Sequence, residues 1–323
     1  MKVFVTRRIP ESGLELLRIE HEIEVNLHDR VLTKEEIIER VKGKDGLLCL
    51  LTDPIDRDVI FSEHKLKMIA SYAVGYDNID VLAATKRGIP VSNTPGVLTD
   101  TTAEMAWALL FSVARRTVEG DKFTRAGKFK GWAPMLMMGQ GVSNKTLGVI
   151  GAGRIGAAFA LKSKGFNMNV LYVNDRINKT LERELGAKKV DLHEALKKSD
   201  YISLHIPLNK STHHMIGEKE LKMMKKTAVL INTSRGPIVD EKALVKALKE
   251  KWIFGAGLDV YEHEPTISKE LTILENVTIQ PHSASATIET RTKMAIMAAE
   301  NMLVGLKGEI PPNCVNPEVF EKK

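Results

Sequence analysis

The chain has 323 residues, of which 43% are hydrophobic and 27% are charged, and its formal net charge is +6 at pH 7. This composition predicts a globular protein of two ordinary domains and excludes a disordered chain. No apolar run approaches the ~18 residues of a membrane span. Lysines and arginines alternate with glutamates, as in KEEIIERVK at 34–42, which argues against a nucleic-acid surface.

Neither the beginning of the chain nor its cysteines indicate export or a metal site. The opening residues, MKVFVTRRIP, lead directly into a predicted strand and lack the apolar core of a signal peptide. Cys49 and Cys314 are the only cysteines and show no metal-ligand spacing. We therefore expect a cytoplasmic protein with reduced cysteines, no metal and no membrane contact.

Residues 1–92 alternate short apolar runs with amphipathic segments. The predicted strands are 3–6, 23–25, 46–51, 67–71 and 89–92, and the predicted helices are 13–19, 34–41, 58–61 and 79–87. Such βαβ alternation predicts a parallel sheet with helices on both faces. Residues 73–78 follow the fourth strand, where an open parallel sheet usually places its ligand loop.

A long apolar helix is predicted at 99–118, and an irregular arm is predicted at 119–141. The arm contains Trp132 and a run from Met135 to Met138 that includes Leu136. Apolar residues on such an arm favour a partner interface over a cofactor pocket. We therefore expect a homodimer.

Residues 146–176 form the most informative stretch of the chain. A strand is predicted at 146–150, a helix at 157–164 ended by Gly165, and a second strand at 168–173. Gly151, Gly153 and Gly156, with Arg154 and Ile155 between the last two, give a G-x-G-x-x-G spacing. The glycines allow a tight turn, close approach of a pyrophosphate and close packing of helix on strand. This order predicts a dinucleotide site.

Further strands are predicted at 201–204, 228–232, 255–259 and 277–280, and a last helix at 286–306. The six strands of this region predict a doubly wound nucleotide fold of the Rossmann type. Residues 1–98 do not complete the first domain by themselves, so we expect the last helix to return to it. The predicted division is a substrate domain at 1–98, a dinucleotide-binding domain at 99–287 and a returning segment at 288–323, with a cleft between the domains.

Several stretches in this order resemble the D-isomer-specific 2-hydroxyacid dehydrogenase family, and most of all its archaeal-type glyoxylate/hydroxypyruvate reductases. They are YAVGYDNID at 72–80, NTPGVLTDTTAEMAWALL at 93–110, GVIGAGRIG at 148–156, LINTSRGPIVDEKALVKAL at 230–248, GAGLDVYEHEP at 255–265 and PHSASAT at 281–287. The resemblance implies a flavodoxin-like substrate domain beside the Rossmann-type domain. It also implies hydride transfer between a nicotinamide cofactor and a small 2-oxo or 2-hydroxy acid.

The family's catalytic trio maps onto Arg235, Glu264 and His282, each just beyond a predicted strand. A protonated imidazole at His282 would donate a proton to the carbonyl oxygen. The carboxylate of Glu264 would orient that ring and stabilise its charged form. The planar fork of Arg235 suits the substrate carboxylate. Alternatives remain for two of the positions: His205, His213 and His214 for His282, and His263 or Glu262 for Glu264.

The resemblance also implies residues that bind substrate and cofactor. The backbone N–H groups of Val74 and Gly75 would complete the carboxylate pocket, with Ser285 close by. The residues expected to line the cofactor are Thr102, Pro207, Thr233, Ser234 and Asp259, the last near the nicotinamide carboxamide. Ser283 and Ala284 stand where relatives often have Ile-Gly, and Leu136 stands where related reductases often carry tryptophan. These departures leave the identity of the 2-oxo acid open.

The cofactor preference depends on the end of the second strand of the nucleotide unit. Asn174 occupies the usual place of an acidic residue that binds the adenosine ribose, and it is compatible with NAD(H) or NADP(H). Asp175 would repel a 2′-phosphate, while Arg176 would attract one. We expect NAD(H) to be favoured, with NADP(H) as the alternative. Two other functions stay open: a D-3-phosphoglycerate dehydrogenase and a non-enzymatic, corepressor-like NAD sensor.

Overall fold

The computed structural model describes residues 1–321 and divides them into two compact units. The first unit combines Met1–Leu98 with the segment that begins at Ala286, and the second unit is Thr99–Ser285. Each unit contains one sheet in which all strands are parallel, so the predicted α/β class is confirmed. Among these residues, no helix has the length and apolar character needed to cross a membrane.

The first unit has a sheet in the order β2-β1-β3-β4-β5. Its strands are β1 (Lys2–Val5), β2 (Glu22–Val25), β3 (Gly46–Cys49), β4 (Met68–Ser71) and β5 (Val91–Ser92). Its helices are α1 (Glu11–Glu20), α2 (Lys34–Val41), α3 (Arg57–Phe61), α4 (Val81–Lys86) and α13 (Ile288–Leu306), followed by the short 3₁₀ helix η3 (Pro317–Phe320). The central strands β3 and β4 are buried throughout, as expected of strands covered on both faces.

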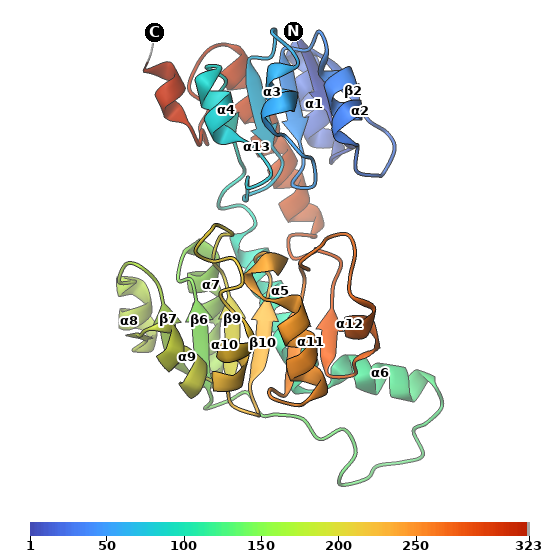
Figure 1. Ribbon diagram of the computed structural model, residues 1–323, viewed down its shortest axis with the longest axis vertical. Coiled ribbons are helices and arrows are strands. Elements are labelled where there is room, and N and C mark those ends of the chain that lie inside the picture. The colour runs from blue at the N-terminus through green and yellow to red at the C-terminus, as the bar shows by residue number, and fades with distance from the viewer. Residues whose placement is uncertain (322–323) are drawn as a thin grey trace. The chain divides into compact units, whose positions relative to one another are not determined.

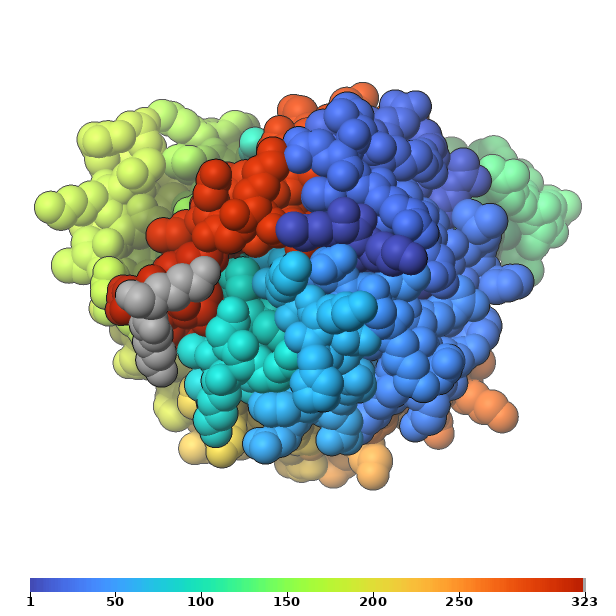
Figure 2. Space-filling model, turned by 90° about the horizontal axis from the view of Figure 1, so that it is seen from above, coloured from blue at the N-terminus to red at the C-terminus, as the bar shows by residue number. Residues whose placement is uncertain are grey.

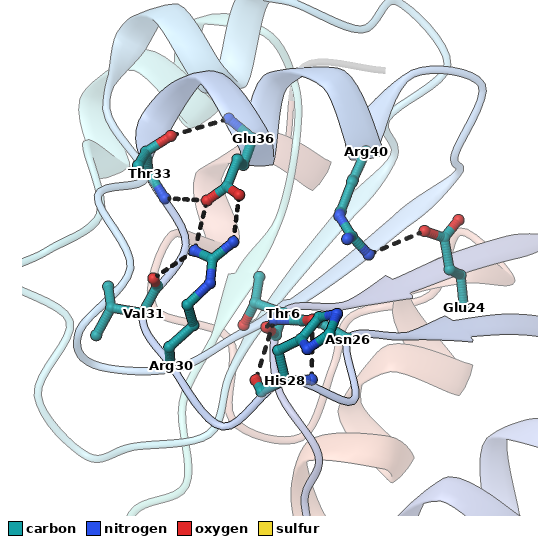
Figure 3. Close-up of polar contacts among 9 residues, drawn as sticks. All are labelled: Thr6, Glu24, Asn26, His28, Arg30, Val31, Thr33, Glu36 and Arg40. Carbon is teal, nitrogen blue, oxygen red and sulfur yellow. Dashed lines mark hydrogen bonds and ion pairs between the residues drawn. The ribbon is translucent and has the colours of Figure 1, made fainter.

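Local side-chain contacts fix the loops of this unit (Figure 3). Thr33 and Glu36 form a capping box that starts α2, and Arg30 pairs with the same Glu36 carboxylate. At the carboxyl edge of the sheet, the Asn26 amide donates to the Thr6 carbonyl at 3.0 Å. Because Asn26 is buried, this bond ties the loop after β2 to the end of β1.

The segment after residue 285 is part of the core of the first unit. The helix α13 packs against α1 and β4. The orange to red residues of the C-terminal segment lie beside the blue N-terminal residues on the surface in Figure 2. A Cβ built on Gly13 would lie 2.6 Å from the Ala295 carbonyl oxygen, so the two helices meet where only glycine fits. The buried Asn301 accepts the Asn313 N–H and donates to the Asn93 carbonyl, which fixes the last turns of the chain.

The second unit has a sheet in the order β12-β11-β10-β9-β6-β7-β8. The strands are β6 (Thr146–Ile150), β7 (Asn169–Val173), β8 (Lys188–Lys189), β9 (Tyr201–Leu204), β10 (Val229–Asn232), β11 (Gly255–Leu258) and β12 (Val277–Ile279). The α-helices are α5 (Thr99–Ala114), α6 (Thr117–Arg125), α7 (Arg154–Lys162), α8 (Lys179–Leu185), α9 (Leu192–Lys198), α10 (Glu218–Met223), α11 (Glu241–Lys249) and α12 (Lys269–Ile273). The short helices η1 (Ser163–Phe166) and η2 (Gly236–Ile238) complete the unit.

Two apolar layers cover this sheet. On one face, α5 and α7 pack around Trp107 and Phe159, whose rings lie 5.0 Å apart. On the other face, α9, α10 and α11 bury a second apolar cluster and stand in front of the sheet in Figure 1. The chain passes from one face to the other between β6 and β9, which is the switch point where such sheets bind nucleotides.

Three details of the predicted elements are wrong. The helix predicted to run to residue 118 ends at Ala114, because Arg116 adopts a left-handed backbone, and a separate helix, α6, replaces the start of the predicted irregular arm. Within residues 1–321, the second sheet has a seventh strand, β8, that the six-strand prediction omits. The left-handed residue that ends the turn after α7 is Asn167 and not Gly165.

Candidate active site

The three predicted catalytic residues follow three neighbouring strands. Arg235 comes after β10, Glu264 after β11 and His282 after β12. These strands are adjacent and parallel, so their carboxyl ends share one edge of the sheet. The strand order therefore places Arg235 and His282, which are 47 positions apart in sequence, at the same edge of the sheet.

His282 and Glu264 form a hydrogen-bonded pair. The Nδ1 atom of His282 lies 2.8 Å from Oε2 of Glu264, and the two side chains are 24% and 28% exposed. Burial alone would raise the pKa of Glu264, but its bonds to His282 and to the Tyr261 N–H, with the Arg235 charge, outweigh burial and lower that pKa. Glu264 is therefore ionised at neutral pH. With Nδ1 engaged, the free ring nitrogen of His282 is Nε2.

A buried carboxylate holds the loop that carries His282. His282 has a backbone φ of 52°, a left-handed conformation that is uncommon for a residue with a side chain. The two N–H groups that follow, those of Ser283 and Ala284, donate to the two oxygens of Asp259 at 2.7 and 2.8 Å. Asp259 is fully buried, and burial raises its pKa in spite of these bonds. The pair of bonds stabilises the strained turn.

Arg235 is held against the loop of Glu264. The Asn232 amide donates to the Arg235 carbonyl at 2.9 Å, which closes the turn after β10. The next residue, Gly236, lies so close to the loop after β11 that a Cβ on it would be 1.8 Å from the Tyr261 carbonyl oxygen. Only glycine permits this approach. The arginine loop and the glutamate loop are therefore interlocked.

Tyr261 and two glutamates brace the same loop. The hydroxyl of the buried Tyr261 donates to the Gln280 carbonyl at 2.7 Å and so links the ends of β11 and β12. Glu262 accepts the Glu241 N–H at 3.0 Å, and Glu241 accepts the Glu262 N–H at 3.1 Å. Glu262 also lies 2.8 Å from Nε2 of His214. Glu262 and His214, considered above as alternatives, therefore pair with each other and not with His282.

His205 is unsuited to proton donation at neutral pH. Burial lowers the pKa of His205 to about 3, and its Nε2 lies 2.9 Å from the Ser203 hydroxyl oxygen. Its ring packs on Phe159 with centroids 5.0 Å apart. The ring is therefore neutral and belongs to the packing beneath the glycine loop.

The glycine loop lies at the carboxyl end of β6, and its shape fits a pyrophosphate. Gly151 has a φ of 95°, and a Cβ on it would lie 2.4 Å from the His205 carbonyl oxygen. A Cβ on Gly156 would lie 1.9 Å from the Gly151 carbonyl oxygen. Gly153 is exposed and faces open space, and no side chain within residues 1–321 caps the helix that it starts. The N–H groups at the start of α7, including those of Arg154 and Ile155, are thus available to an anion.

The end of β7 is tied to the glycine loop by two asparagines. Asn174 accepts the Ala152 N–H at 3.2 Å, and Asn178 donates to the Ala152 carbonyl at 3.0 Å. The Asn174 amide also donates to the Arg176 carbonyl at 2.9 Å, so this side chain is engaged by backbone on both sides. Lys189 of β8, which sequence reasoning missed, donates to the Asp175 carbonyl at 2.8 Å. A two-residue lysine strand gives no periodicity signal by which it could be recognised.

The other predicted site residues lie in both units. In the second unit, Thr102 and Thr233 are buried, Ser234 donates to the Leu204 carbonyl, and Pro207 is exposed while its carbonyl accepts the Thr212 hydroxyl. The Thr233 hydroxyl is buried and has no hydrogen-bond partner among the described residues, a feature that suits a site for a polar ligand. Ser285 is half-buried.

Val74 and Gly75 belong to the first unit, in the loop after β4. The Val74 carbonyl accepts the Asn93 amide at 2.8 Å, which fixes the loop. Across residues 1–321, no group of three or more histidine, cysteine or acidic side chains has the arrangement needed to hold a metal ion.

Comparison with known proteins shows the family. The family described as "D-isomer specific 2-hydroxyacid dehydrogenase, NAD binding domain" matches residues 107–284. A protein of Korarchaeum cryptofilum named glyoxylate reductase is 55% identical over 99% of this chain and 97% of its own length. The crystal structure of the TT0316 protein from Thermus thermophilus is 44% identical, with a TM-score of 0.92, and the match covers 98% of this chain and 100% of that one.

A third relative has been solved with a cofactor. It is the NADPH-dependent glyoxylate/hydroxypyruvate reductase of Sinorhizobium meliloti in complex with NADP and malonate. It is 29% identical, with a TM-score of 0.87, and the match covers 100% of this chain and 98% of that one. The family match covers more than half of the chain, and the Korarchaeum relative spans almost all of it. The chain therefore belongs to the D-isomer-specific 2-hydroxyacid dehydrogenase family.

Proposed function

We propose that this dehydrogenase reduces glyoxylate or hydroxypyruvate. The observation that carries the proposal is the His282–Glu264 pair at the edge of the sheet that also carries Arg235. The pair supplies a proton donor and the arginine supplies an anion-binding fork, which together are what a 2-oxo acid requires. The name of the Korarchaeum relative, which is 55% identical over nearly the whole chain, supports a small 2-oxo acid.

The chemistry divides between the cofactor and the chain. A bound nicotinamide supplies the hydride. Nε2 of His282 donates the proton to the carbonyl oxygen, and Glu264 at Nδ1 stabilises the protonated ring before transfer. Arg235 orients the substrate by its carboxylate. Val74, Gly75 and Ser285 are proposed as further substrate contacts, because peptide N–H groups and a hydroxyl suit the same anion.

The glycine loop is proposed to bind the cofactor pyrophosphate through Gly151, Gly153 and Gly156. Thr102, Pro207, Thr233, Ser234 and Asp259 are proposed to line the rest of the cofactor, and the partnerless Thr233 hydroxyl supports this. We propose that NAD(H) is favoured over NADP(H), since the exposed Asp175 carboxylate opposes a 2′-phosphate.

A cytoplasmic homodimer is proposed as the working form. Four large apolar side chains of the segment after α6 are more than half exposed: Phe129, Trp132, Met135 and Met138. In the same unit, a cavity of about 640 Å³ at the junction of α5 and α6 is lined by Val113, Phe254 and Leu274 among others. Several large apolar side chains exposed on one segment are typical of an interface.

The purified protein should be assayed with glyoxylate, hydroxypyruvate, pyruvate and phosphohydroxypyruvate, each with NADH and with NADPH. We expect kcat/KM to be highest for glyoxylate or hydroxypyruvate. A clear preference for phosphohydroxypyruvate would favour the phosphoglycerate dehydrogenase alternative. Absence of turnover with all four acids, together with tight NADH binding, would favour the sensor alternative.

A further inference from the structure

We propose that Lys189 is a specificity-determining residue that lets the adenosine end of the site accept the 2′-phosphate of NADP(H). The proposal rests on the proposed dinucleotide site and deepens it. It concerns how far this chain can discriminate between the two cofactors.

The position of Lys189 follows from strand pairing. In the sheet, Lys189 is the register partner of Tyr172 in β7. Its long side chain then reaches past the end of β7, so that Nζ lies 2.8 Å from the Asp175 carbonyl oxygen. In a nucleotide-binding fold, residues at the carboxyl end of the second strand bind the adenosine ribose. Lys189 therefore brings an ammonium group to that place from a strand outside the G-x-G-x-x-G motif.

The turn that receives this ammonium is rigid and open. Asn174 and Asn178 hold it to the two sides of the Ala152 peptide, and the Tyr172 hydroxyl accepts the Asn178 N–H at 3.0 Å. Asp175 is exposed, and its carboxylate makes no hydrogen bond or ion pair with another residue in the described part of the chain. The turn is thus fixed by backbone contacts while its charged side chains face solvent.

The charges at the turn do not favour NAD(H) strongly. Asp175 contributes one negative charge, whereas Arg176 and Lys189 contribute two positive charges, and all three residues are exposed. A phosphate here would be repelled by one group and attracted by two. The Lys189 ammonium has three donors and uses one for the Asp175 carbonyl, which leaves two for a phosphate oxygen. We therefore expect Lys189 to offset the repulsion from Asp175, so that NADP(H) is accepted beside NAD(H).

Equilibrium binding separates this role from catalysis. Dissociation constants for NAD⁺, NADP⁺, 5′-AMP and 2′,5′-ADP are to be measured by isothermal titration calorimetry at low and high KCl. Lys189→Ala should weaken NADP⁺ and 2′,5′-ADP about fivefold, which corresponds to about 1 kcal/mol, and should leave NAD⁺ and 5′-AMP within twofold. The loss should shrink at high KCl, because the contact is exposed. Lys189→Arg should restore binding of the phosphorylated ligands.

The neighbouring lysine is a matched control. Lys188 has the same charge on the same two-residue strand, but alternation along a strand directs its side chain to the opposite face. Lys188→Ala should therefore leave all four constants unchanged. Equal weakening of NAD⁺ and NADP⁺ by Lys189→Ala would overturn the proposal and show that Lys189 only anchors the turn. Unchanged NADP⁺ binding would also overturn it. Failure of the wild type to bind either dinucleotide would overturn the cofactor site itself.

Discussion

The hydrogen bond between His282 and Glu264 indicates that His282 is the proton donor, and this role can be tested by substitution. His282→Ala removes the group proposed to protonate the carbonyl oxygen, so kcat should fall by ~10²–10⁴. The NADH dissociation constant should stay within twofold, because the ring is not part of the glycine loop. His263→Ala is the control, since the His263 side chain is 76% exposed and lies next to Glu264 in sequence. Near-normal turnover of His282→Ala at neutral pH would contradict the mechanism.

His205 makes a prediction for the pH dependence of stability. Its pKa is about 3 in the folded chain against an ordinary value near 6.5, so between these values the unfolded chain binds the proton more tightly. The stability that His205 contributes is complete above about pH 6.5 and is lost as the pH falls toward 3. The free energy of unfolding of the wild type should therefore fall as the pH is lowered from 7 to 5. For His205→Gln this fall should be smaller by about 1–2 kcal/mol.

Denaturant unfolding at the two pH values measures this difference. The exposed His193 of α9 provides the control, and His193→Gln should follow the wild type. An identical pH dependence in His205→Gln would mean that the folded protein protonates His205 as readily as the unfolded chain does.

At the scale of elements, the interlock between the loops after β10 and β11 predicts the effect of a single methyl group. Gly236→Ala would place a Cβ 1.8 Å from the Tyr261 carbonyl oxygen, so one of the two loops must move. A shift of about 1 Å in catalytic groups typically costs ~10²-fold in rate. We expect kcat to fall by that order and the melting temperature to drop. Gly165→Ala, where nothing lies within 4 Å, should leave both unchanged. Full activity of Gly236→Ala would show that the two loops can accommodate the methyl group without displacing the catalytic side chains.

The elements that the sequence predicts are those whose signal is local. The β6–α7–β7 unit has buried strands, a glycine loop and an amphipathic helix, and the structure contains all of them. The strand β8 was missed because two exposed lysines carry no β-strand pattern, and its pairing to β7 is purely tertiary. The break at Arg116 was missed because its left-handed backbone has no glycine to mark it.

The same distinction applies to the site. Arg235, Glu264 and His282 could be named from motifs, because each follows a predictable strand. Other contacts of the site join the ends of separate strands: Tyr261 bonds Gln280, and Asp259 bonds the loop after His282. No sequence pattern predicts such contacts. Lys189 was missed for the same reason. Such residues become visible only when the strand order is known.

For the whole molecule, the division of the chain predicts the behaviour of fragments. The second unit is continuous from Thr99 to Ser285, whereas the first needs the segment after residue 285. In the first unit, α13 packs against α1 and β4, and its Met294, Ala295 and Met302 are buried. A fragment of residues 99–285 should therefore unfold cooperatively by circular dichroism, and a fragment of residues 1–98 should not. Cooperative unfolding of residues 1–98 alone would show that α13 is dispensable.

The exposed apolar side chains of the segment after α6 should determine how the chain assembles. Trp132 is 85% exposed and Met135 is 74% exposed. The segment after α6 that contains them is the long green loop in Figure 1. Burying two such side chains contributes several kcal/mol to association, at about 1.5–3 kcal/mol for each large apolar group. We therefore expect the wild type to be a dimer at micromolar concentration by light scattering, and Trp132→Ser combined with Met135→Ser to be mostly monomeric. Ile19→Ser is the control, because Ile19 is 76% exposed on α1, which belongs to the first unit, and it should remain dimeric. A monomeric wild type would exclude the interface, and a double variant as dimeric as the wild type would place it elsewhere on the chain.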